Sequence, residues 1–206
     1  MKQKYFIDSH KGITFLFILF LLYWYNAWDN TTALIYLALH GTYGILWVLK
    51  SVTFPDRQWE SKCSLWYGLL IWFGLSLYWI APYIIITKNI LAPGWYIAAC
   101  VSMYILGVFF HFTSDMQKFV QLKYNPSKLI KEGMFKSIRN MNYLGELFIY
   151  AGFSMLAMHW IPLAVLGAFI VFVWIPNMIK KDKSLSRYEN FNDYKNKSNS
   201  FFPFIW

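Results

Sequence analysis

The sequence predicts an all-α protein, a polytopic bundle of about six membrane-spanning helices. Of its 206 residues, 58% are hydrophobic and only 14% are charged, a composition outside the usual range of soluble globular domains. Apolar runs with few internal charges recur along the chain at lengths suited to crossing a bilayer. Six runs are predicted to span the membrane: Gly12 to Trp28, Thr32 to Val48, Ser64 to Thr87, Leu91 to Phe112, Tyr143 to Met158, and Ile161 to Ile179.

The basic residues alternate with these runs and predict that both termini face the cytoplasm. Three lysines or arginines precede the first run, three separate the second from the third, six separate the fourth from the fifth, and six follow the sixth. Only Lys88 lies on the other side, as the positive-inside rule requires. Topology therefore explains the net charge of +9, and we expect no nucleic-acid partner. The expected location is a bacterial inner membrane or the endoplasmic reticulum.

The first two runs form a predicted helical pair. The first run follows lysines as a signal peptide does, but bulky aromatic residues stand where a cleavage site needs small ones, so we expect it to be retained. The second run carries polar and aromatic side chains on one face at helical spacing. Its Tyr43 has two interpretations: an ordinary interhelical hydrogen-bonding residue, or the donor of a proton to a substrate carbonyl.

The third and fourth runs are predicted to be long helices. Pro82 predicts a kink or an early exit from the third near Ala81. The fourth continues past the membrane, because Asp115 and Lys118 extend one face of its helix. A solvated helix end explains these two residues as well as a ligand contact does.

The stretch from Gly133 to Glu146 leads into the fifth run. It places a cation, an amide, a phenol and a carboxylate on one helical face: Arg139, Asn142, Tyr143 and Glu146. Ionisable groups at the mouth of a span are candidates for function. Before this stretch, KLIKEG at 128–133 is predicted to be an amphipathic segment on the membrane surface.

Topology gathers polar residues at the cytoplasmic ends of the last three runs: Asp115, Lys118, Arg139, Asn142, Glu146 and Asp182. Cations suit the phosphates of a pyridine dinucleotide, and amide or carboxylate groups suit its ribose and carboxamide. No G-x-G-x-x-G pattern follows a strand, so a nucleotide would be held between helices and the tail. That tail is predicted to fold back on the bundle, because it is rich in aromatic residues: Tyr188, Phe191, Tyr194, Phe201, Phe202 and Phe204.

Three stretches resemble the steroid 5-alpha-reductase C-terminal domain family, whose relatives include sterol reductases and isoprenylcysteine carboxyl methyltransferases. GMFKSIRNMNYLGE is similar to its signature G-L-W-x-x-x-R-H-P-N-Y-x-G-E, with Asn140 and Met141 in place of His-Pro. SDMQKF at 114–119 resembles its S/A-D-x-Q-K segment. The chain from Asp182 onward resembles its acidic, tyrosine-containing tail.

The resemblance implies an NADPH-dependent reductase of a carbon-carbon double bond in a steroid- or isoprenoid-like enone. Such a substrate would enter from the bilayer, and the cofactor from the cytoplasm. One domain, 1–206, would then have a substrate side at 1–112 and a cofactor side at 113–206, with Tyr43 as catalytic donor. The residues expected to bind NADPH are Asp115, Lys118, Arg139, Asn142, Tyr143, Glu146, Asp182 and Tyr194.

Two other functions remain open. An S-adenosylmethionine-dependent methyltransferase shares the Arg-to-Glu signature and the acidic tail, although SDMQKF favours the reductases. A non-catalytic relative that binds membrane lipid is favoured by the missing His-Pro. No metal site is expected, since neither Cys63 nor Cys100 has a neighbouring His or Cys at metal-ligand spacing.

Overall fold

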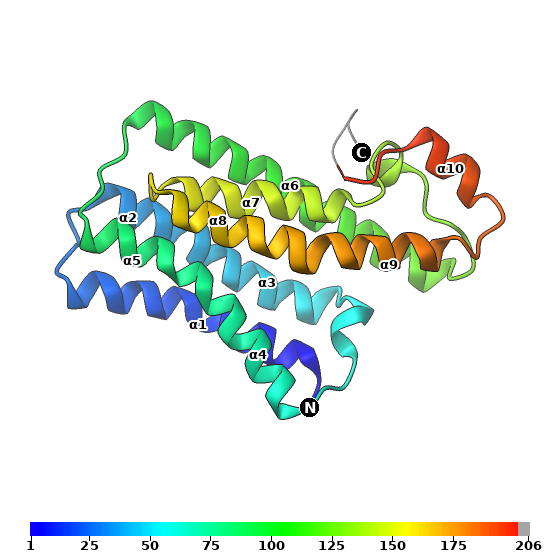
Figure 1. Cartoon of the computed structure of the whole chain (residues 1–206), viewed down its shortest axis with the longest axis horizontal. Coiled ribbons are helices and arrows are strands. Elements are labelled where there is room, and N and C mark those ends of the chain that lie inside the picture. The colour runs from blue at the N-terminus through cyan, green and yellow to red at the C-terminus, as the bar shows by residue number, and fades with distance from the viewer. Residues whose placement is uncertain (202–206) are drawn as a thin grey trace. The chain divides into compact units, whose positions relative to one another are not determined.

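The computed structural model describes residues 1–201, and the chain is helical over most of this range (Figure 1). The α-helices are α1 (Gln3–Trp24), α2 (Thr31–Tyr36), α3 (Thr42–Thr53), α4 (Leu65–Ser76), α5 (Ile80–Thr87), α6 (Gly94–Tyr124), α7 (Met141–Met155), α8 (Trp160–Phe169), α9 (Ile175–Leu185) and α10 (Phe191–Lys197). Residues 1–201 contain isolated β-bridges but no strand. The predicted all-α class is confirmed.

Five helical segments within residues 1–201 are long and apolar enough to span a membrane: Gln3–Trp24, Thr31–Thr53, Leu65–Thr87, Gly94–Tyr124 and Trp160–Leu185. Each corresponds to one of the predicted spans. The predicted span at Tyr143 to Met158 is instead the 15-residue helix α7. At this length α7 rises only about 22 Å, short of the roughly 30 Å of a hydrocarbon core. With five segments of this length and composition, the protein is a polytopic membrane protein.

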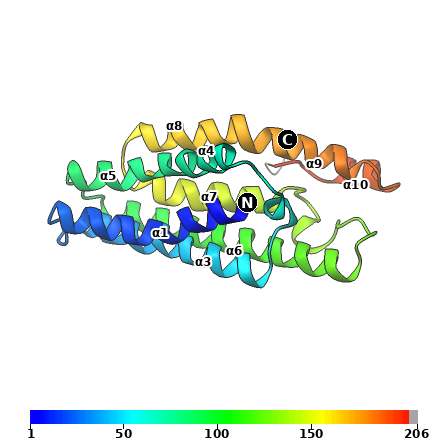
Figure 2. The same cartoon turned by 90° about the horizontal axis from the view of Figure 1, so that it is seen from below.

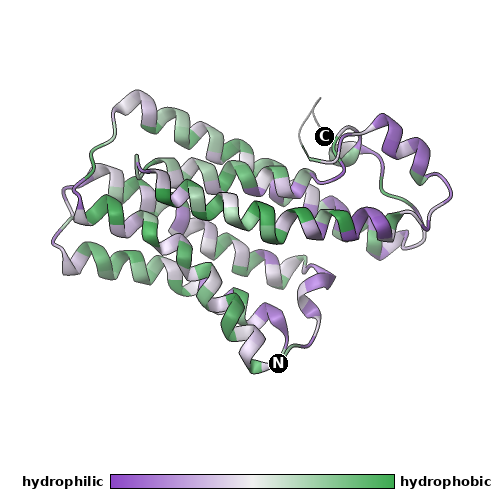
Figure 3. Cartoon of the chain, viewed as in Figure 1, coloured by the Kyte–Doolittle hydropathy of each residue, from purple (hydrophilic) through white to green (hydrophobic). Residues whose placement is uncertain are grey.

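Two compact units make up the chain. Unit 1 comprises Met1–Tyr104 and Tyr150–Leu166, and unit 2 comprises Ile105–Ile149 and the chain from Gly167 onward. Helices α6, α7 and α8 contribute residues to both. Figure 3 shows that hydrophilic residues concentrate in α10, the end of α9 and the segment between α3 and α4. The remaining helices are mainly apolar, as expected for spans.

Helix α1 begins well before the predicted span, and this places two polar residues inside it. His10 is 2% exposed and Lys11 is 4% exposed. Lys11, one of the three basic residues counted before the first predicted span, is therefore buried within the protein and not solvated. The helix α3 packs along α1, and Gly44 permits close contact with the Lys11 backbone. Tertiary packing, which periodicity does not reveal, buries both residues.

The third span is interrupted just before Pro82 (Figure 2). A 3₁₀ turn at Leu77–Trp79 separates α4 from α5. Proline has no N–H to donate to the carbonyl four residues earlier. The Tyr36 hydroxyl donates to that carbonyl, on Tyr78, at 3.3 Å. The break expected near Ala81 thus lies at the preceding turn, where the Tyr78 carbonyl accepts from a backbone N–H as well as from the Tyr36 hydroxyl.

The segment before α7 differs from its prediction as an amphipathic surface segment. Residues 128–132 are not helical. Leu129 instead packs against Phe191 and Tyr194 of α10. The tail therefore folds back within unit 2 as predicted, and Phe201 is also buried. Phe202 and Phe204 lie outside the described residues.

We expect Gly44→Ala to destabilise unit 1. A Cβ atom at residue 44 would overlap the Lys11 carbonyl oxygen and lie 3.0 Å from its carbon, so α1 and α3 would have to separate. Overpacking of this kind costs about 1–3 kcal/mol. Thermal unfolding in detergent measures the effect, and Gly167→Ala is the matched helical control, because nothing lies within 4 Å of its added Cβ. Equal melting temperatures for the two variants would contradict the prediction.

Candidate functional site

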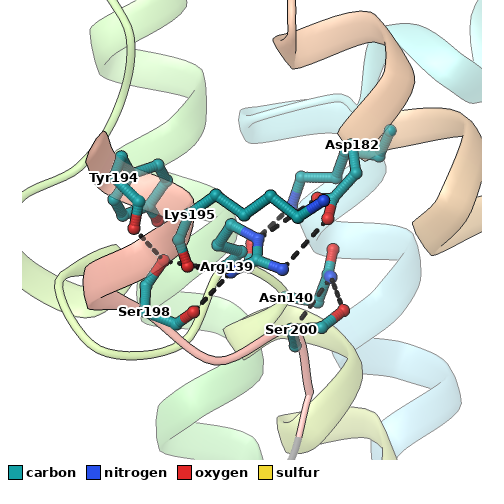
Figure 4. A network of polar contacts seen from close by, with 8 residues as sticks. Arg139, Asn140, Asp182, Tyr194, Lys195, Ser198 and Ser200 are labelled. Carbon is teal, nitrogen blue, oxygen red and sulfur yellow. Dashed lines mark hydrogen bonds and ion pairs between the residues drawn. The ribbon is translucent and has the colours of Figure 1, made fainter. Parts of the chain in front are cut away.

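Arg139, just before α7, is the centre of a polar network in unit 2 (Figure 4). Its Nε and Nη2 donate to the two carboxylate oxygens of Asp182 at 3.3 and 3.0 Å. Its Nη1 donates to the carbonyl oxygens of Lys195 at 3.3 Å and Ser198 at 2.5 Å, and to Ser198 Oγ at 3.2 Å. The side chain of Arg139 is only 6% exposed. Its donors are therefore directed to α9 and the tail.

The backbone beside Arg139 also holds the tail. Arg139 N donates to Asn199 O at 2.9 Å, and Asn140 N donates to Ser200 O at 3.1 Å. The Asn140 side chain is fully buried, and its Nδ2 donates to Ser200 O at 2.9 Å. Where the resembled signature has His-Pro, this chain thus has an asparagine that binds the tail.

Tyr194 fixes the tail from α10. Its hydroxyl donates to Phe135 O at 2.5 Å, and its carbonyl accepts from Ser198 Oγ at 2.6 Å. Burial raises the pKa of Tyr194 to about 12, so the phenol stays protonated and remains a donor at neutral pH. Three residues predicted to bind cofactor are thus brought together in the structure: Arg139, Asp182 and Tyr194. Their hydrogen bonds, however, join parts of unit 2 to each other.

A second group of polar residues lies where α6 packs on α7. His111 Nδ1 is 3.1 Å from Asn142 O, and because a carbonyl oxygen only accepts, Nδ1 carries the proton. His111 Nε2 is 3.8 Å from Asp115 Oδ2. Gly145 permits this packing, since a Cβ there would meet the His111 backbone. Asp115 and Asn142 are thus neighbours through His111, a residue absent from the predicted site.

The amide oxygen of Asn142 is notable within this group. Its Oδ1 atom is buried and has no hydrogen-bond partner among the described residues. Glu146 lies one helical turn further along the same face of α7. Lys118 continues the His111 and Asp115 face of α6 and is half-buried. This face of unit 2 could therefore accept hydrogen bonds from a polar ligand.

Tyr143 makes a ring contact with the segment that precedes α9. Its ring centroid is 5.8 Å from that of Trp174, which ends the π-helical turn Ile170–Trp174. Through this contact the Tyr143 ring packs against Trp174 within unit 2.

Gln117 anchors the loop that leads to α7, and sequence reasoning missed it. Its Oε1 accepts from Met134 N at 2.9 Å, and its Nε2 donates to Glu132 O at 2.8 Å. Gly133 between them has a φ of +59°, which favours glycine. The glutamine of SDMQKF therefore positions the chain entering α7.

Tyr43 lies in unit 1, in an aromatic cluster around the Lys11 ammonium. Lys11 Nζ donates to the Tyr150 hydroxyl. It lies 4.3, 4.8 and 4.9 Å from the ring centroids of Tyr43, Trp47 and Tyr150. Cation–π attraction stabilises a charge in such surroundings. Lys11 and Tyr150 were missed, because only the tertiary fold brings residue 11 to residue 150.

We expect Arg139→Lys to release the tail. An ammonium cannot make the paired contact with Asp182 and still reach Ser198, so charge-assisted bonds worth about 1.5–3 kcal/mol each are lost. Limited proteolysis with proteinase K should cut 186–198 faster in the variant, whereas exposed Lys136→Arg should leave the rate unchanged. Unchanged protection together with lost nucleotide binding would instead assign Arg139 to a ligand.

Comparison with known proteins gives a family but no activity. An uncharacterized protein of Schizosaccharomyces pombe is 31% identical over 67 residues, which are 32% of this chain and 24% of that relative. The chain thus matches about a quarter of the relative's length. No solved structure matches. Residues 1–198 match the family described as a protein of unknown function, DUF1295, and because this match covers nearly all of the chain, the chain belongs to that family.

Proposed function

We propose that this protein is an NADPH-dependent reductase of a carbon-carbon double bond conjugated to a carbonyl, in a lipid-soluble steroid- or isoprenoid-like substrate. One observation carries the proposal. Unit 2 contains every residue that sequence analysis assigned to the cofactor, and one of them, Asn142, has a buried side-chain oxygen with no hydrogen-bond partner among the described residues. These residues lie on α6, in the segment 139–146, on α9 and on α10: Asp115, Lys118, Arg139, Asn142, Tyr143, Glu146, Asp182 and Tyr194. The resemblance of these segments to steroid 5-alpha-reductases supports the activity.

The residues fit a nucleotide in part. Asn142 Oδ1 is a buried acceptor that a carboxamide N–H or a ribose hydroxyl would satisfy. Asp115 and Glu146 add acceptors on adjoining faces of α6 and α7. Arg139 does not fit as a phosphate ligand, because its guanidinium binds Asp182 and the tail. The exposed Lys180 and Lys183 of α9 are better phosphate partners.

The proposed substrate side is the N-terminal part of the chain, 1–112, which includes Tyr43. When bound, the cofactor supplies a hydride to the carbon beta to the carbonyl. Tyr43 would donate its hydroxyl proton to the carbonyl oxygen, where negative charge develops. The Lys11 ammonium, 4.3 Å from the Tyr43 ring, favours that charge. Membrane lipid is the medium from which the substrate would be taken.

The competing functions are separated by cofactor preference. We expect NADPH, and not S-adenosylmethionine, to raise the melting temperature of the purified chain, since a ligand at about 100 times its Kd stabilises by about 2.7 kcal/mol. Stabilisation by S-adenosylmethionine alone would assign the methyltransferase. Stabilisation by neither would favour a non-catalytic lipid-binding protein.

We expect Asn142→Ala and Glu146→Ala to weaken NADPH binding while the chain stays folded. Each truncation removes hydrogen bonds worth about 0.5–3 kcal/mol, or roughly 2- to 150-fold in Kd. Titration of NADPH against each variant measures the loss. The exposed Asn125→Ala and Glu189→Ala are controls of the same residue types. If the site variants fail to fold but their folded fraction binds normally, their role is structural.

We expect Tyr43→Phe to lower turnover about 100-fold or more with NADPH affinity unchanged, because it removes only the donor. Consumption of NADPH with an enone substrate measures turnover. Tyr67→Phe, on the exposed part of α4, is the control and should keep full activity. Full activity of Tyr43→Phe would refute the donor assignment.

A further inference from the structure

His10 is a buried polar residue in α1 of unit 1 that the proposed chemistry does not use. It is 2% exposed, and neither of its ring nitrogens has a hydrogen-bond partner among the described residues. Buried imidazole nitrogens are normally paired, and an unpaired one is costly. His40 provides the contrast: it is equally buried, but its Nδ1 lies 2.7 Å from the Tyr36 hydroxyl. His10 therefore has unused hydrogen-bonding capacity.

Aromatic rings surround His10 on the side of α4 and the 3₁₀ turn. The Trp79 ring stacks on His10 at 4.7 Å with an interplanar angle of 16°. The Trp72 ring meets it edge-on at 5.1 Å and 84°. Trp79 Nε1 donates to Thr14 Oγ1 at 3.1 Å, so this indole donor is already used. The surroundings offer His10 flat apolar faces and no replacement for its missing partner.

The two indoles adjoin a surface suited to lipid. Trp72 and Trp79 are half-buried, so they contact His10 while remaining partly exposed. Their neighbours Leu70, Phe73 and Leu77 are 67, 62 and 55% exposed in a span that is apolar throughout. Trp79 ends the 3₁₀ turn, and a 3₁₀ stretch within a helix is a common hinge. Movement of this hinge would give a molecule in the bilayer access to His10.

We propose that His10 binds a hydroxyl or carbonyl oxygen of a lipid-soluble ring molecule that enters from the bilayer between α1 and the α4–α5 break. A pure hydrocarbon would leave the imidazole unpaired, and a charged head group does not suit the apolar rings. Only the identification of this ligand as the substrate rests on the proposed function; the binding site itself is inferred from His10 and the rings around it. We assign His10 a binding role and keep Tyr43 as the proton donor, because the two residues have different neighbours. His10 contacts Trp72 and Trp79. Tyr43 lies beside Lys11, which also contacts Tyr150.

The test compares two steroids with one ring skeleton on the full chain in detergent, without NADPH. The probes are androst-4-ene-3,17-dione and the hydrocarbon 5α-androstane, and quenching of tryptophan fluorescence gives each Kd. We expect the wild type to bind the dione about 3- to 10-fold more tightly, as one added hydrogen bond predicts. His10→Phe should bring the ratio close to one, with a melting temperature equal to or above that of the wild type.

Two controls keep the result specific. His40→Phe removes an equally buried but paired histidine, so it should lower the melting temperature and keep the preference for the dione. In the wild type, ¹⁵N-labelled histidine should show a ring-nitrogen shift of His10 on adding the dione but not the hydrocarbon, a readout that needs no variant. Equal binding of both probes by the wild type, or an undiminished preference in His10→Phe, would overturn the proposal. If the wild type binds the dione as expected but does not oxidise NADPH with it, the reductase function is contradicted and the His10 binding site is not.

Discussion

Polar groups inside a hydrocarbon core have to find partners within the protein, because the solvent offers none. This requirement accounts for much of the internal structure. Pro82 cannot donate to the Tyr78 carbonyl, which accepts instead from a backbone N–H of the 3₁₀ turn and from the Tyr36 hydroxyl. Lys11 brings a charge into α1, and its ammonium contacts three aromatic rings, one of which, Tyr150, also accepts a hydrogen bond from it. His10 departs from the rule, and that departure makes it a candidate for binding a ligand.

In unit 2 the same requirement changes the meaning of the motif before α7. An arginine at the mouth of a span suggests a phosphate ligand, yet Arg139 joins Asp182 of α9 to the carbonyl groups of the tail. Breaking a largely buried pair leaves an uncompensated charge, so this contact constrains the unit strongly. Asn140 adds a second link to the tail through Ser200. Arg139 and Asn140 therefore connect α7 to the tail, while the side-chain oxygens of both Asn140 and Asn142 are buried acceptors without a hydrogen-bond partner among the described residues.

The charge distribution also bears on chemistry. A cation beside Tyr43 stabilises negative charge on an oxygen and opposes positive charge on a carbon. In the proposed reaction, Lys11 would therefore stabilise the negative charge that develops on the carbonyl oxygen of an enone. The sequence alone did not indicate this contact, because Lys11 counted only as one of the three basic residues that precede the first predicted span. The burial of Lys11 supports an enone as the proposed substrate.

The sequence by itself determined the helical class, five spanning segments, the break near Pro82 and the return of the aromatic tail, because composition, hydrophobic runs and proline act locally. Only the tertiary structure decided which partners the polar residues bind: Arg139 donates hydrogen bonds to residues 182 and 198, and Lys11 donates to Tyr150. Such partners lie far apart in the chain, and no local pattern encodes a contact that exists only after the helices pack.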